Sequence, residues 1–185
     1  LAGASFLGYG KRAYAAYTAC HSTGGTTYLC DSAATETQDF TGKNNAAITA
    51  GAGFSVNTAT GSGITITGEG ALSFTDTNAV NSVSITSAAD GKPGLYMLSY
   101  GASGDILGSV NVYSNSQITS AYDAIFTVNL GGGGTTILSN GNLTGAYSGI
   151  WAVNVGAGAS DITVNGDITS SAGSGVVATN FGAST

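Results

Sequence analysis

A repeat of 25 residues dominates the second half of the chain. Two consecutive blocks align without a gap and carry the same kinds of residue at matching places: Ser120 to Thr144, SAYDAIFTVNLGGGGTTILSNGNLT, and Gly145 to Thr169, GAYSGIWAVNVGAGASDITVNGDIT. Each block contains three short apolar runs separated by Gly, Asn and Ser. A repeat of this length indicates a solenoid, in which each unit buries its core against its neighbours.

The repeat extends in both directions from these blocks. Asp90 to Thr119 matches after an insertion of five residues, and Ser171 to Thr185 gives a partial unit. We predict three short strands per coil, which makes each repeat one coil of a β-helix. The first strand is expected at Leu95 to Tyr100, Ile125 to Leu130, Ile150 to Val155 and Val176 to Phe181; the second at Ser109 to Tyr113, Thr136 to Ser139 and Asp161 to Val164; and the third at Gln117 to Thr119, Asn142 to Thr144 and Asp167 to Thr169.

Composition favours an all-β solenoid forming one elongated domain. The 185 residues include 30 Gly, one Pro and only 8% charged side chains, so helix formers are scarce and corner residues abundant. A hydrophobic content of 42% is enough for a packed core. We expect residues 1–45 to form an N-terminal cap or arm and residues 46–185 to form the coils, the last of which is incomplete.

The charge distribution excludes two classes of partner. The net charge is -6, from ten acidic and four basic residues, and no Lys or Arg follows Lys92. Binding to nucleic acid or to an anionic membrane surface requires clustered positive charge. No apolar run approaches the roughly twenty residues that a membrane-spanning helix needs. The sequence therefore predicts no nucleic-acid partner and no transmembrane segment.

The two cysteines, Cys20 and Cys30, lie on either side of Gly24 and Gly25. This spacing is typical of a short hairpin whose arms are joined by a disulfide, which would stabilise the fold by roughly 2 to 3 kcal/mol and indicates an oxidising compartment. The alternative is a metal site in which cysteine, His21 and Asp31 are the ligands. That spacing matches no common zinc pattern and no fourth ligand is in sight, so we expect no metal and no cofactor.

Gly and Asn recur at the expected corners. Asn140-Gly141 and Asn165-Gly166 fall at the same point of their units, and this dipeptide accepts the positive φ angles of a tight turn. A separate set of asparagines stacks at the end of the first strand. We expect its side chains to form a structural hydrogen-bonded ladder along the solenoid axis. Its members are Asn129, Asn154 and Asn180.

The first strand leaves open which of its two faces is buried. One alternating set, such as Ile125, Thr127 and Asn129, begins with an aliphatic residue, continues with a small one and ends with Asn. The other set contains the larger residues. Because large side chains are usually buried, the default expectation places the larger set in the core. If the smaller set points inward instead, an apolar column lies on the surface and marks an interface. That column would be Tyr96, Phe126, Trp151 and Val177.

Catalytic groups are sparse. Asp161 and Asp167 belong to one coil but are separated by an Asn-Gly turn, and glycoside hydrolysis needs converging carboxylates. The only histidine is His21, and no serine and aspartate pair accompanies it as a hydrolytic triad would require. We therefore expect no enzymatic activity, with a carbohydrate-active β-helix as a minor alternative.

The repeats GIWAVNVGAGASDITVNGDIT and DAIFTVNLGGGGTTILSNGNLT resemble bacterial autotransporter passenger domains, which belong to type V secretion. The segment ACHSTGGTTYLCDSAATET is similar to the Cys-flanked hairpin that often opens such passengers. This resemblance implies a right-handed, pectin-lyase-like parallel β-helix that is exported through the periplasm of a Gram-negative cell and displayed on its surface or secreted. These 185 residues contain neither the translocator barrel nor the protease module of that family.

The resemblance leads to two main functional hypotheses. In the first, the chain is a structural or adhesive β-helix that binds a receptor or a glycan on a host or neighbouring cell. In the second, it is a processed subunit of an extracellular filament, in which chains associate end to end by β-augmentation. The Tyr-rich start, with Tyr9, Tyr14 and Tyr17, would then cover the last coil of the next subunit.

Overall fold

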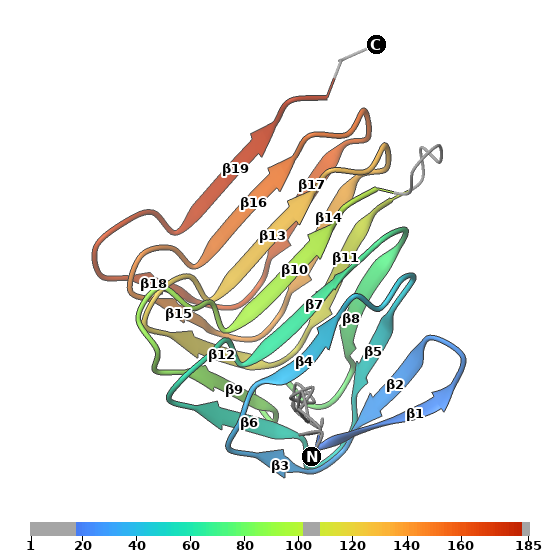
Figure 1. Cartoon of the computed structure of the whole chain (residues 1–185). Helices are drawn as coiled ribbons and strands as arrows, with labels where there is room; N and C mark the ends of the chain where they lie inside the picture. Colours follow the sequence, from blue (N-terminus) through green and yellow to red (C-terminus); the bar gives the residue numbers. More distant parts are fainter. Residues whose placement is uncertain (1–17, 102–107, 183–185) are drawn as a thin grey trace, which may run out of the picture.

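The computed structural model describes residues 18–101 and 108–182. The chain winds into a solenoid of about five turns with about 26 residues per coil, and its first and last described strands lie at opposite ends of the stack (Figure 1). All regular elements of the described residues are strands. No helix in the described part of the chain is long and apolar enough to cross a membrane.

Three sheets form the sides of the solenoid, and all their strand pairs are parallel except the antiparallel pair β1 (Cys20–Gly24) and β2 (Thr27–Cys30). Sheet A contains β1, β2, β5 (Ala47–Ala50), β8 (Leu72–Asp76), β11 (Val110–Ser114), β14 (Thr135–Ser139) and β17 (Ser160–Val164). Sheet B contains β3 (Ala33–Ala34), β6 (Ser55–Thr58), β9 (Ser84–Ser87), β12 (Gln117–Ser120), β15 (Leu143–Gly145) and β18 (Ile168–Ser170). Sheet C contains β4 (Gln38–Thr41), β7 (Ile64–Gly68), β10 (Leu95–Ser99), β13 (Ile125–Asn129), β16 (Ile150–Asn154) and β19 (Val176–Asn180).

The strand register confirms the predicted solenoid. In sheet C, Leu95 pairs with Ile125, Ile125 with Ile150, and Ile150 with Val176, all in parallel and without a shift. Parallel pairing already includes β2, β3 and β4, which lie within the residues 1–45 expected to form a cap. The coils therefore begin before residue 46, because these short strands continue the same ladders. Residues 1–17, with the three tyrosines of the predicted arm, lie outside the described residues.

The interior is filled by alternate side chains of each strand, two or three from most strands. Large residues such as Phe40 and Phe74 fill the earlier coils, and Ile125 and Ile150 fill the later ones. All of these residues are at most 1% exposed. In the last described coil, Ile162 and Ile168 are only partly buried, because no further described coil covers them.

The smaller set of side chains in sheet C points inward, so the default expectation about the core was wrong. Ile125, Thr127 and Asn129 are completely buried, whereas Phe126 and Val128 lie half-buried on the outer face. The physical reason is the strand period of two combined with Asn129, whose amide must reach the interior corner. Because side chains alternate along a strand, an inward Asn129 places Thr127 and Ile125 in the interior as well. The bulky rings at the positions between them then lie outside.

Candidate functional site: the outer aromatic face of sheet C

An outer aromatic column lies along sheet C and consists of Tyr96, Phe126 and Trp151, one from each of three successive coils. The ring centroids of Tyr96 and Phe126 are 5.6 Å apart, with planes inclined by 22°, and those of Phe126 and Trp151 are 5.7 Å apart. Val177 follows Trp151 in register. The structure therefore places all four residues of the hypothesised interface in one continuous apolar row on the surface.

A second pair of rings stands beside this column, on the corner between sheets B and C. Tyr122 precedes β13 and Tyr147 precedes β16, and their ring centroids are 5.4 Å apart. Tyr122 is half-buried, whereas Tyr147 is 53% exposed. Sequence reasoning missed this corner pair, although both tyrosines occupy the same place in the repeat, in SAYD and GAYS.

A depression of about 430 Å³ opens between the column and the corner. Its walls include Tyr96 and Phe126 from the column, Tyr122 from the corner pair, and the turn containing Lys92 and Pro93. Such a volume lies at the small end of the range typical of ligand pockets, and aromatic walls with a few polar groups are their usual lining. The depression is thus a candidate binding site.

The polar groups of the depression are the phenol hydroxyls of Tyr96 and Tyr122, the hydroxyl of Ser62 and the ammonium group of Lys92. Burial raises the pKa of Tyr96 above its ordinary value of 10.0, and the nearby Tyr100 raises it further. Its hydroxyl is therefore a neutral hydrogen-bond donor at physiological pH. Lys92 is exposed and has no ion-pair partner among the described residues. The site can offer stacking surfaces and hydrogen bonds, but little net charge.

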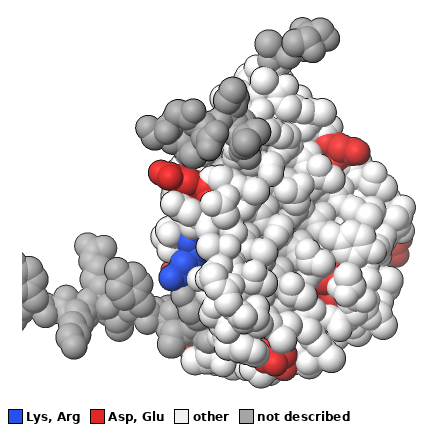
Figure 2. Space-filling model, turned by 90° about the vertical axis from the view of Figure 1, so that its right-hand side faces the viewer, with Lys and Arg blue, Asp and Glu red and all other residues white. Residues whose placement is uncertain are grey.

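Charged side chains are also sparse elsewhere on the solenoid. Figure 2 shows one face on which the few acidic side chains lie apart from one another. Asp161 lies in β17 and Asp167 precedes β18, and both are exposed. Among residues 18–101 and 108–182, no three His, Cys, Asp or Glu side chains gather as a metal site would require.

Trp151 should report directly on the exposure of the column. Because its indole is half-buried on the outer face of β16, we expect acrylamide to quench its fluorescence efficiently in the native protein. Stern-Volmer quenching measures this accessibility, and Trp151 is the only tryptophan in the sequence. Quenching as weak as that of a fully buried indole in a dilute monomer would contradict the outward orientation.

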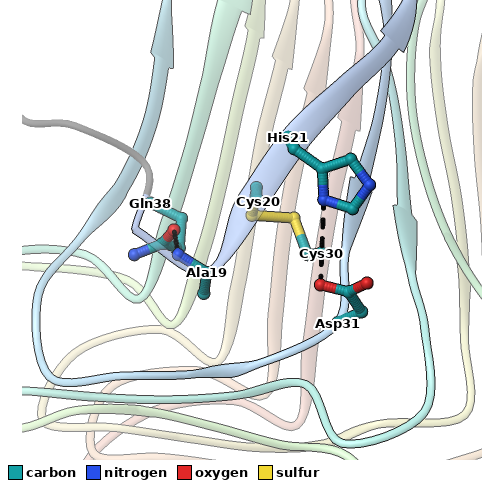
Figure 3. Close-up of polar contacts among 6 residues, drawn as sticks. All are labelled: Ala19, Cys20, His21, Cys30, Asp31 and Gln38. Carbon is teal, nitrogen blue, oxygen red and sulfur yellow. Dashed lines mark hydrogen bonds and ion pairs between the residues drawn. A yellow bond between two sulfur atoms is a disulfide. The ribbon is translucent and has the colours of Figure 1, made fainter.

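The N-terminal hairpin contains the predicted disulfide. Cys20 pairs directly with Cys30 across β1 and β2, with their Cα atoms 3.9 Å apart, and the two sulfurs are bonded (Figure 3). His21 Nδ1 lies 3.8 Å from Asp31 Oδ1, and both side chains are exposed. On the other side, Gln38 accepts a hydrogen bond of 3.2 Å from the amide of Ala19. The cysteines are therefore structural and are not available as metal ligands.

The predicted asparagine ladder joins three coils of sheet C. Asn129 donates to Asn154 at 2.9 Å, and Asn154 donates to Asn180 at 3.2 Å. A second ladder lies at the corner after sheet A, where Asn140 donates to Asn115 and Asn165 donates to Asn140, both at 2.8 Å. Asn140 and Asn165 therefore link neighbouring coils by hydrogen bonds, in addition to lying at the corners of the chain.

The reason expected for the two Asn-Gly corners was wrong. Neither Gly141 nor Gly166 has a positive φ; among the described glycines this conformation occurs elsewhere, for example at Gly24 and Gly25 in the hairpin. A side chain at Gly141 would overlap the backbone carbonyl of Ser116 in the preceding coil, and one at Gly166 would overlap that of Gly141. Close approach between coils, and not the turn conformation, requires glycine here.

One buried carboxylate has no full set of partners. Asp123 is 0% exposed and lies two residues before β13, where the matching positions before β7, β16 and β19 are Ser62, Ser148 and Ser174. Neither carboxylate oxygen makes a hydrogen bond of standard geometry. Burial raises the pKa of Asp123 above its ordinary value of 3.8, although nearby groups of Ser148 lower it in part.

Replacing Asp123 with Ser should change how stability depends on pH. In the wild type the folded state retains the proton more strongly, so stability should be greatest below the ordinary carboxyl pKa and fall as pH rises through the raised pKa. Asp123→Ser removes this loss and should be the more stable protein at neutral pH, by about 1 to 3 kcal/mol. Urea denaturation of both proteins between acid and neutral pH measures the difference. A wild type whose stability rises across that range relative to Asp123→Ser would contradict the assignment.

Comparison with known proteins gives no relatives. No protein-family model, no curated protein and no solved structure matches this chain. The parallel β-solenoid is consistent with the pectin-lyase-like architecture expected from the sequence, but no family match supports an autotransporter origin.

Proposed function

We propose that this chain is an extracellular, non-enzymatic β-helix whose outer sheet C face attaches it to another surface. The observation that carries the proposal is the outer aromatic column, which is contiguous over three coils and accompanied by the half-buried Leu98, Val128 and Val153. Soluble monomers seldom expose such apolar rows unless they bind something. The disulfide fits an oxidising compartment outside the cytoplasm.

This proposal is in line with the resemblance to autotransporter passengers of Gram-negative bacteria. A passenger that acts as an adhesin needs a rigid scaffold and a side face for contact. The three sheets of the solenoid supply the rigid scaffold, and the outer face of sheet C supplies the contact face. The scarcity of converging carboxylates among the described residues favours binding over catalysis.

An adhesion assay tests the role of sheet C. Beads coated with the purified chain should adhere to cells of the producing organism or its host, and the double variant Phe126→Ser, Trp151→Ser should lose most of this adhesion. The matched control is Tyr113→Ser, Leu138→Ser, a pair that is in register on neighbouring coils of sheet A. Equal adhesion of both variants and the wild type would contradict the proposal. Antibody labelling of intact producing cells tests the location.

A contact at the end of the solenoid is a second candidate function. β17, β18 and β19 form the last layer, and in the described residues their outer edges have no strand partner. Unpaired strand edges above a partly exposed core favour addition of another layer. Two kinds of layer would fit these edges: a further coil of the same polypeptide, or a second copy of the chain. Electron microscopy of the purified chain distinguishes the two, since filaments require contacts between copies.

A further inference from the structure

The two sets of aromatic rings meet at the depression, and both run from coil to coil along the solenoid. Tyr96, Phe126 and Tyr122 converge on the depression, and each set continues into the next coil through Trp151 and Tyr147. The spacing of successive rings, 5.4 to 5.7 Å, follows from the coil repeat of about 4.8 Å between hydrogen-bonded strands. The two sets of rings therefore present a periodic surface.

This periodicity selects an extended polymer as the ligand. Pyranose rings in an extended oligosaccharide follow one another at a comparable distance, so that successive sugars meet equivalent rings. Aromatic side chains offer a large, rigid apolar surface to the C–H faces of sugars, while phenol hydroxyls bond to sugar hydroxyls. Tyr96 and Tyr122 bring both features to the walls of the depression.

The charge of the protein indicates that the polymer is neutral. The chain carries a net charge of -6, and Lys92 is the only basic residue at the depression. An acidic polysaccharide would face the repulsion of the whole molecule with one exposed ammonium group to oppose it. For a neutral sugar, Lys92 needs only to donate hydrogen bonds, which its unpaired ammonium group can do.

We propose that the depression between the outer aromatic column and the corner pair, together with the rings that continue both sets, binds a neutral oligosaccharide, with Tyr96, Tyr122 and Phe126 stacking on its sugars. This inference rests on the proposed function, because it names the ligand of the same face of sheet C. It assigns the strongest contact to the depression, where three rings and Lys92 surround one volume.

Titration of the purified chain with defined oligosaccharides tests the inference. The probes are cellohexaose and maltohexaose as neutral ligands and hexagalacturonate as the acidic one, followed by calorimetry and by Trp151 fluorescence. We expect saturable binding of at least one neutral probe. Tyr122→Ala and Tyr96→Ala should each weaken it by about three- to tenfold, as expected for the loss of one aromatic contact. Lys92→Gln should weaken it by less.

The matched control is Tyr113→Ala, which removes an exposed tyrosine from sheet A and should leave the affinity unchanged. Circular dichroism and thermal unfolding verify that each variant folds. Absence of binding to both neutral probes in the millimolar range, equal affinity of all variants, or tighter and salt-sensitive binding of hexagalacturonate would each overturn the inference. Adhesion that depends on Phe126 and Trp151 without any neutral-sugar binding would overturn this inference alone and leave the proposed function standing.

Discussion

Replacing Asn129 with Ala is expected to lower the free energy of unfolding by about 3 to 4 kcal/mol. Asn129 is completely buried; its amide donates to Gly133 O at 2.7 Å and to Asn154 at 2.9 Å, and its oxygen accepts from the amide of Gly131 at 3.0 Å. Alanine leaves these groups unsatisfied in the interior, where water does not replace them. Urea denaturation followed by circular dichroism and Trp151 fluorescence measures the loss.

Asn165→Ala is the matched control for this effect. Asn165 also belongs to a ladder and donates to Asn140 at 2.8 Å, but it is exposed. Because water can satisfy Asn140 after the change, we expect a loss below about 1 kcal/mol. Similar losses for the two variants would mean that burial is not what gives the inner ladder its importance.

The repeat was sufficient to predict the solenoid and most of its strands. Apolar runs bounded by Gly and Asn recur at a fixed distance, and strands of a solenoid can pair only with their counterparts one coil away. That is why the predicted Ile125 to Leu130 and Ile150 to Val155 agree with β13 and β16 to within one residue. The early coils were harder to recognise, because the strands from Thr27 to Thr41 are short and carry no clear copy of the repeat.

The candidate site could be predicted only in part. Tyr96, Phe126 and Trp151 were recognised as a column because they share a repeat position, but the sequence did not decide whether they face inward. That decision depends on packing: the interior has room for Thr127 and Ala152, and the buried asparagines fix the register. Tyr122 and Lys92 join the site through a corner, outside the alternation of the strands. Tyr122 recurs as Tyr147 in the repeat, but the strand pattern does not show that a corner residue lies beside the column.

A methyl group at Gly141 should be more disruptive than its small size suggests. The backbones of neighbouring coils are fixed at hydrogen-bond distance; the amide of Asn140, for example, donates to Ser114 O at 2.8 Å. A Cβ at Gly141 would overlap Ser116 O and lie 2.6 Å from Asn115 O, and both are backbone atoms that cannot rotate away. Gly141→Ala must therefore separate two coils locally, and we expect a loss of about 2 to 3 kcal/mol in the free energy of unfolding.

Gly175→Ala separates this steric effect from the general effect of replacing glycine. Gly175 also precedes a strand at a corner and has no positive φ, but a Cβ there would meet only Ile168 at 3.6 Å, an ordinary contact. Alanine should be neutral or slightly stabilising at this position, since it restricts the unfolded chain. Chemical denaturation of both variants provides the comparison. If Gly141→Ala is as stable as Gly175→Ala, the coils can move apart at little cost, and close approach between them does not require glycine at this corner.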